Sequence, residues 1–141
     1  MSLKASGIIA IPGSADTLFD HGAFDAKTRR VFIAHTARNR LEVVDHDKNC
    51  HLATLEGFPE AAGVVAEAGH VLVTNRAAAS LAWVDGRTLA TRAVLDTGPR
   101  PNGVAFVPQR ALAVVACIGD ETRGSELQVL QLDGRQRWSI D

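Results

Sequence analysis

The sequence predicts an all-β fold made of three copies of one repeat of about forty residues. Two observations carry this prediction. Glycines that open an apolar strand recur at positions 22, 63 and 103, and leucines that open a later strand recur at positions 41, 81 and 127. Each repeat also divides into four short apolar runs separated by turn residues, and no window of helical length has apolar residues at a spacing of three to four.

Four short antiparallel strands in every forty residues are the pattern of β-propeller blades. The turn residues place blade one at about 19–57, blade two at about 60–98 and blade three at about 101–141. Residues 7–13 stand before blade one as an outermost strand stands before each later blade, so we expect a leading outer strand there. Three interpretations of that strand stay open. It completes the last blade of a partner, in which residues 135–141 are a weak fourth strand. Otherwise it belongs to a blade outside this sequence, or it lies on the surface as a tail.

Three blades leave two open apolar faces, because each blade packs its faces on its neighbours and only a closed ring covers the last one. Soluble monomers rarely expose apolar patches of that size. We therefore expect a homodimer, in which two copies related by a two-fold axis close a six-bladed ring. The alternative is that the chain is a fragment of a longer propeller.

One segment of the third repeat and the strands that follow it carry a family pattern. Residues 101–108 read Pro-Asn-Gly-Val-Ala-Phe-Val-Pro, followed by a Val-rich strand and then a strand that begins Leu-x-Val. This pattern resembles the YVTN-type β-propeller repeat. His35, Asn75 and Cys117 hold the position where that family usually carries Asn, and residues 71–75 match best. The resemblance runs from about residue 7 onward and implies the propeller fold, whose members serve as binding scaffolds, cell-surface modules and occasionally enzyme platforms.

The composition is that of an ordinary globular domain. The 141 residues are 46% hydrophobic and 22% charged, with a net charge of −1, so we expect no nucleic-acid and no membrane partner. No apolar run is long enough for a signal peptide or a membrane span, which predicts a cytoplasmic protein unless a leader has been removed. Cys50 and Cys117 lie in different repeats and are expected to be free thiols, although one disulfide stays open.

The candidate ligand site lies at the mouth of the central channel, where the loops that enter each innermost strand meet the ends of the second strands. The candidate ligand-binding residues are Asp20, His21, His35, Glu60, Asn75, Arg76 and Asn102. Five of them also have the oxygen and nitrogen donors of a divalent-metal site, namely Asp20, His21, His35, Glu60 and Asn102. Capping of strand ends and turns is the stronger explanation of these residues, so we expect no metal and no cofactor.

Three further groups have a chemical and a structural interpretation. The turn with His46, Asp47, Cys50 and His51 has metal-ligand chemistry, but it is expected to be a solvated hairpin. The arginines of blades one and two (29, 30, 38, 40, 76, 87 and 92) offer a phosphate patch, but Asp25, Glu42, Asp45 and Asp85 between them favour a mixed solvated surface. The insertion at 118–125 interrupts the repeat and is a candidate for binding specificity.

No catalytic or cofactor motif is present, so we name no catalytic residue. The sequence favours a non-enzymatic binding or scaffold module that self-associates and binds a small molecule or a protein at the channel mouth. The alternative is a metal-dependent hydrolase of the lactonase type, in which Glu60, Asn75 and Asn102 would hold the cation.

Overall fold

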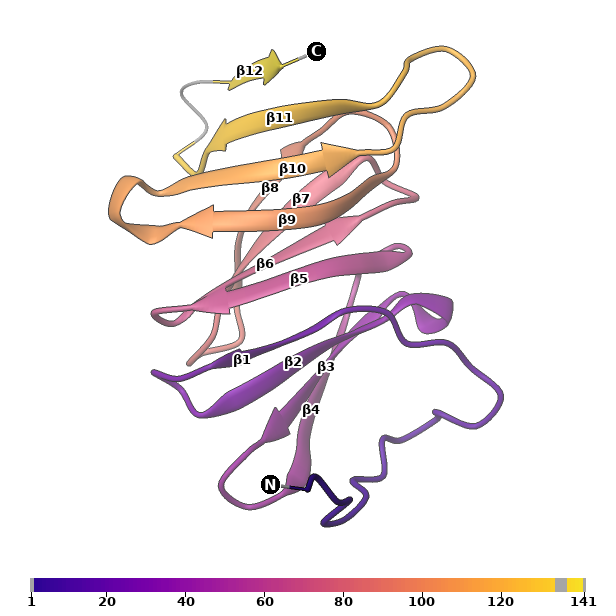
Figure 1. The fold of residues 1–141 in the computed structure, drawn as a ribbon, viewed down its shortest axis with the longest axis vertical. Helices are drawn as coiled ribbons and strands as arrows, with labels where there is room; N and C mark the ends of the chain where they lie inside the picture. Colours follow the sequence, from indigo (N-terminus) through magenta and orange to yellow (C-terminus); the bar gives the residue numbers. More distant parts are fainter. Residues whose placement is uncertain (1, 134–136, 141) are drawn as a thin grey trace.

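The computed structural model describes residues 2–133 and 137–140, which contain three four-stranded antiparallel sheets and no α-helix. The sheets follow one another along the chain and stack as successive blades, with the innermost strands side by side (Figure 1). The predicted fold class, an all-β chain of three propeller blades, is confirmed. Residues 134–136 and 141, which belong to the predicted third blade, lie outside the described residues.

Each blade is a meander in which consecutive strands pair. Blade one contains β1 (Gly22–Asp25), β2 (Arg30–His35), β3 (Arg40–Asp45) and β4 (Cys50–Glu56). Blade two contains β5 (Ala61–Glu67), β6 (His70–Asn75), β7 (Ser80–Asp85) and β8 (Thr91–Asp96). Blade three contains β9 (Pro101–Val107), β10 (Leu112–Cys117), β11 (Glu126–Gln131) and β12 (Arg137–Ile140). Short 3-10 turns, η1 (Thr36–Arg38) and η2 (Pro108–Arg110), follow β2 and β9.

The hydrophobic core lies in two layers between the blades. Phe32, Val43 and Val71 belong to the layer between blades one and two, and Leu72 and Val115 belong to the layer between blades two and three. Successive residues of a strand face opposite sides, so the middle blade must be apolar on both sides. This explains the unbroken apolar run of β6, in which consecutive residues contribute to different layers.

The segment before blade one contains no strand in this chain. Residues 7–13 have no regular structure apart from a turn at Pro12 and Gly13, so the expected leading outer strand does not form in the single chain. A β-strand needs a partner for its backbone hydrogen bonds, and no described strand pairs with residues 7–13. Instead the segment approaches blade one, where Phe19 stacks on the ring of His35 with 4.5 Å between the ring centroids.

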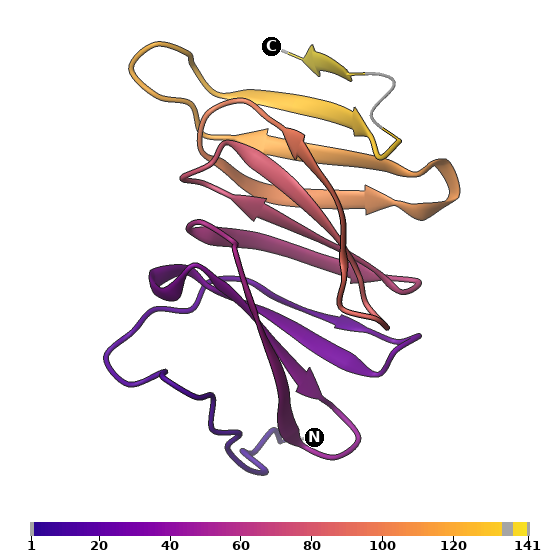
Figure 2. The ribbon, with the colours of Figure 1, turned by 180° about the vertical axis from the view of Figure 1, so that it is seen from behind.

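The two ends of each strand define two faces of the blade stack. The loops that enter β1, β5 and β9 and those that leave β2, β6 and β10 lie together on one side, which we call the mouth face (right in Figure 1). The tight turns that join β1 to β2, β5 to β6 and β7 to β8 lie on the opposite face (Figure 2). In the described part of the chain, no helix is long and apolar enough to cross a membrane.

Candidate binding site at the channel mouth

Four of the seven predicted site residues meet on the mouth face. Arg76, which follows β6, forms an ion pair with Asp20, which precedes β1. Arg76 Nη2 also donates to Asn102 Oδ1 of β9 at 3.4 Å, and Asp20 Oδ1 lies 2.7 Å from His21 Nδ1. The cluster therefore joins residues from all three blades around one guanidinium.

The backbone of blade two holds Arg76 in place. The amide of Arg76 donates to the carbonyl of Glu60 at 3.2 Å, and the amide of Glu60 donates to Asn39 Oδ1 at 2.9 Å. The side chain of Glu60 is exposed and has no described role in the cluster. Glu60 thus contributes its backbone to the mouth, whereas the sequence argument gave it a ligand-binding carboxylate.

Two buried polar atoms at the mouth have no hydrogen-bond partner among the described residues. Asn75 is only 2% exposed, and its Nδ2 donates to Ser80 Oγ at 3.2 Å, but its Oδ1 accepts no hydrogen bond. The Nε of Arg76 is likewise buried and donates no hydrogen bond to a described residue. Buried polar atoms are normally satisfied by protein or by ordered water, so we expect a water molecule or a polar group of a ligand to pair with these two atoms.

His35 does not join the cluster. Phe32 and Ala34 of β2 face blade two, and His35 faces the opposite side, where its ring is fully buried. Its Nδ1 donates to Glu42 Oε1 at 2.8 Å, and its Nε2 lies 3.1 Å from Thr17 Oγ1. The order of hydroxyl, imidazole and carboxylate is that of acyl-transfer triads. Burial leaves the imidazole no access to a substrate, so these contacts hold the N-terminal segment on blade one.

Glu42 is the buried residue that the sequence argument misplaced. It was assigned to a solvated surface together with Asp25, yet both side chains are fully buried. His51 Nε2 and Thr54 Oγ1 also donate to Glu42 Oε2, at 2.9 and 2.6 Å. Burial raises the pKa of Glu42, but the hydrogen bonds from His35, Thr54 and His51 outweigh burial and leave the pKa below its ordinary value. A Glu within an apolar strand was the available signal.

The other candidate groups have structural roles. In the turn that contains His46 and Cys50, Asp47 pairs with Arg29 at 2.7 Å and His51 binds Glu42. These two candidate metal ligands are therefore already paired within the protein. Among the described residues, no group of three or more His, Cys, Asp or Glu side chains is placed to hold a metal ion.

Both cysteines are free. Cys50 is exposed and Cys117 is buried. Burial raises the pKa of the Cys117 thiol above its ordinary value, which makes this thiol unreactive at neutral pH.

The inserted loop borders the mouth face. Asp120 Oδ1 accepts the amides of Thr122 and Arg123 at 2.8 and 3.0 Å, which forms a compact turn. The amide of Ile118 donates to the carbonyl of Arg100 at 3.0 Å, next to the loop that enters β9. The insertion is thus an ordered rim beside the site.

Comparison with known proteins supports the fold. No family model and no curated protein matches the chain. Among solved structures, the chain is similar to hydrazine synthase of Kuenenia stuttgartiensis, with a TM-score of 0.76 and 17% sequence identity over 93% of this chain and 39% of that chain. It is also similar to the WD40 repeats of RRP9 and to U3-55K, each with a TM-score of 0.70 and 12% identity over 84% of this chain.

The chain spans between 35% and 39% of the length of these three structures. At such identities the likeness establishes the fold alone, and the YVTN-type resemblance continues to rest on the sequence pattern. Fold and neighbours together define the class of protein: a β-propeller module.

Proposed function

We propose that the chain is a non-enzymatic propeller module that closes its ring with a second copy of itself and holds a small polar ligand at the channel mouth. The observation that carries the proposal is the outer face of blade three. Registers in blade three place Ala105, Val114 and Val129 opposite one another, and Ala116 opposite Leu127. These residues alternate with those that pack on blade two and so face away from it. Ala105 and Leu127 are exposed, Val114 and Ala116 are half-buried, and Val129 is buried. No described sheet follows blade three in the stack (Figure 1).

A glycine on blade three supports a missing neighbour. In blade two, a Cβ on Gly63 of β5 would lie 1.9 Å from the carbonyl oxygen of Asn102, because the next blade approaches closely there. Gly103 holds the same place in the repeat of blade three. A Cβ on Gly103 would meet only Ala116 Cβ, at 3.8 Å, because no described blade follows. The two glycines thus differ in what lies beyond them, since a described blade follows Gly63 and none follows Gly103.

The outer side of blade one offers a matching surface. Leu18, Phe19 and Phe24 are exposed apolar side chains of blade one and of the segment that leads into it. Two copies in a two-fold arrangement bring blade three of each copy against blade one of the other, so that both open faces are covered by one repeated contact. Closure also brings two mouth clusters to one channel.

The ligand part of the proposal rests on the mouth cluster. Asp20 offers a carboxylate, Arg76 a guanidinium and Asn102 an amide, and Asn75 Oδ1 lacks a donor. A small molecule with both donor and acceptor groups complements this set. No observation favours the lactonase alternative, since Asn75 is turned toward Ser80 and Glu60 is outside the cluster.

The test is the solution mass of wild-type chain by light scattering during size exclusion at several concentrations. We expect about 30 kDa, twice the 15.0 kDa of the chain. Leu127→Arg places a charge on the outer face of blade three, and we expect it to weaken association by at least roughly tenfold. Val94→Arg is the matched control, because Val94 is an exposed strand residue of the middle blade. A wild-type monomer at all concentrations, or equal weakening by both variants, contradicts ring closure.

A further inference from the structure

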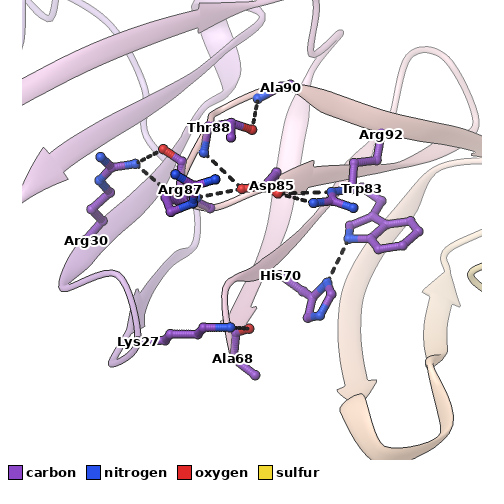
Figure 3. A network of polar contacts seen from close by, with 11 residues as sticks. Lys27, Arg30, Ala68, His70, Trp83, Asp85, Arg87, Thr88, Ala90 and Arg92 are labelled. Carbon is purple, nitrogen blue, oxygen red and sulfur yellow. Dashed lines mark hydrogen bonds and ion pairs between the residues drawn. The ribbon is translucent and has the colours of Figure 1, made fainter.

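A second cavity lies on the opposite face, between blades one and two. Its volume is about 510 Å³, within the range of small-molecule sites. Blade one contributes Lys27 and Arg30, and blade two contributes His70, Arg87 and Arg92. Figure 3 shows the residues of the two blades around this space. The turns of the opposite face form this cavity, so it is separate from the mouth cluster.

The lining is strongly cationic. Four side chains of the cavity are Lys or Arg, and Asp85 is its one carboxylate among the described residues. Asp85 is already engaged: it pairs with Arg92 and accepts the amides of Arg87 and Thr88, both at 2.9 Å. Its pKa is held below the ordinary value, with the hydrogen bond from Arg92 as the largest cause. Lys27, Arg30 and Arg87 therefore face the cavity without a carboxylate partner in the described chain.

The backbone fixes Arg30 before any ligand arrives. Arg30 Nη1 donates to the carbonyls of Gly86 and Arg87, both at 2.7 Å, which leaves Nη2 of the same guanidinium available. Lys27 Nζ lies 3.4 Å from the carbonyl of Ala68, a weak contact that an anion can replace. Ordered cationic side chains lose less entropy on binding than mobile ones, so this arrangement favours a ligand.

His70 lines the cavity, and its ring is held between blades two and three. Trp83 Nε1 donates to His70 Nδ1 at 3.1 Å, and Trp indole nitrogen is a donor only. Phe106 of blade three packs edge-on against the same ring, with 5.6 Å between the ring centroids, so the imidazole faces blade three and is not one of the groups offered to a ligand. Trp83 also lies under Arg92, whose guanidinium is 5.7 Å from the ring centroid, so the wall beside His70 is held by stacking.

We propose that this cavity binds a small anionic molecule through a phosphate group or a pair of carboxylates. Guanidinium and ammonium groups around a cavity recognise such anions by charge-assisted hydrogen bonds. The inference does not depend on ring closure or on the mouth site, because only blades one and two form the cavity.

The test is calorimetric titration of the intact chain with pyrophosphate, with inorganic phosphate and with citrate. Binding of pyrophosphate or phosphate but not citrate assigns a phosphate ligand. Binding of citrate but of neither phosphate compound assigns a polycarboxylate. Lys27→Gln and Arg87→Gln each remove one unpaired cation, and we expect each to weaken binding roughly tenfold. Arg110→Gln is the control: it removes the same charge from an exposed residue of η2 outside the cavity, and binding should not change.

Two results overturn the proposal. One is that none of the three anions binds wild-type chain at millimolar concentration. The other is that Arg110→Gln weakens binding as much as the cavity variants, which would mean attraction by net charge alone. Circular dichroism establishes whether the variants are folded. If one of the two cavity variants does not fold, the binding measured for the other one tests the proposal.

Discussion

The carboxylate of Glu42 combines full burial with three side-chain donors. His35, His51 and Thr54 all donate to its two oxygens, and Thr17 and Phe19 cover His35 from the N-terminal segment. A buried carboxylate is stable only when it is compensated in this way. The network therefore links the stability of blade one to the ionisation of a single residue.

Glu42→Gln tests this link, because the amide has nearly the same shape but no charge. We expect a loss of about 2 kcal/mol in the free energy of unfolding at pH 7, since charge-assisted hydrogen bonds are lost. The folded-state pKa of Glu42 lies below its ordinary value of 4.5, so the charged form stabilises the fold above that pH. As pH falls through the folded pKa, this contribution disappears and the difference between wild type and variant must narrow.

Urea unfolding from pH 7 to pH 3.5 measures this difference. Glu56→Gln serves as the control, because Glu56 pairs with Arg40 on the exposed edge of blade one and surface pairs contribute less than about 1 kcal/mol. If the loss of unfolding free energy caused by Glu42→Gln does not change with pH, then the shape of the Glu42 side chain, and not its ionisation, stabilises blade one.

At the scale of elements, β5 and β9 approach each other unusually closely. Thr74 Oγ1 accepts the amide of Gly63 at 2.8 Å and donates to the carbonyl of Asn102 at 2.7 Å, so one hydroxyl bridges two blades. Gly63 has no side chain to separate the strands, and this absence is what permits the bridge. The packing of blade two on blade three depends on that position.

Gly63→Ala should therefore destabilise the chain by about 2–3 kcal/mol, because the new methyl overlaps a backbone oxygen that cannot move alone. Gly103→Ala makes the same chemical change where the nearest atom is 3.8 Å away, so it should lower the free energy of unfolding only slightly. Both substitutions are made in the Leu127→Arg variant, which is expected to be monomeric. Denaturant unfolding of both variants in that background compares them. Equal losses would mean that strand propensity, and not the close approach, governs these glycines.

The sequence predicted the strands better than the directions of its polar side chains. The recurring glycines and leucines located the four-stranded blades, because the spacing of apolar residues follows the strand period and the length of a blade. The same periodicity does not show whether His35 turns to the mouth or to Glu42. The sequence offered the arginines of blades one and two as a phosphate patch but favoured a mixed solvated surface, because it does not show that Arg30 and Arg87, far apart in sequence, meet when two blades pack. Residues 7–13 read as a strand, but no described strand pairs with them.

At the scale of the whole molecule, the proposed two-fold ring would connect the mouth site to self-association. The cluster of Asp20, Arg76 and Asn102 lies where the innermost strands of three blades converge, and a second copy would face it with the same three residues. A carboxylate and a guanidinium in one site complement the ammonium and the carboxylate of a zwitterion. A panel of free amino acids is therefore a suitable set of probes for the mouth.

We expect at least one amino acid of the panel to bind wild-type chain in a nitrogen-15 NMR titration, with the largest shifts at the amides of Asp20, Arg76 and Asn102. Arg76→Gln should weaken binding roughly tenfold, because a charge-assisted hydrogen bond is lost. Leu127→Arg should weaken it too, since a separate half-ring offers only one of the two clusters. Arg110→Gln, on the opposite face of blade three, should leave the shifts unchanged. If Arg76→Gln weakens binding and Leu127→Arg does not, one chain suffices for the site, and self-association serves only to cover the open blades.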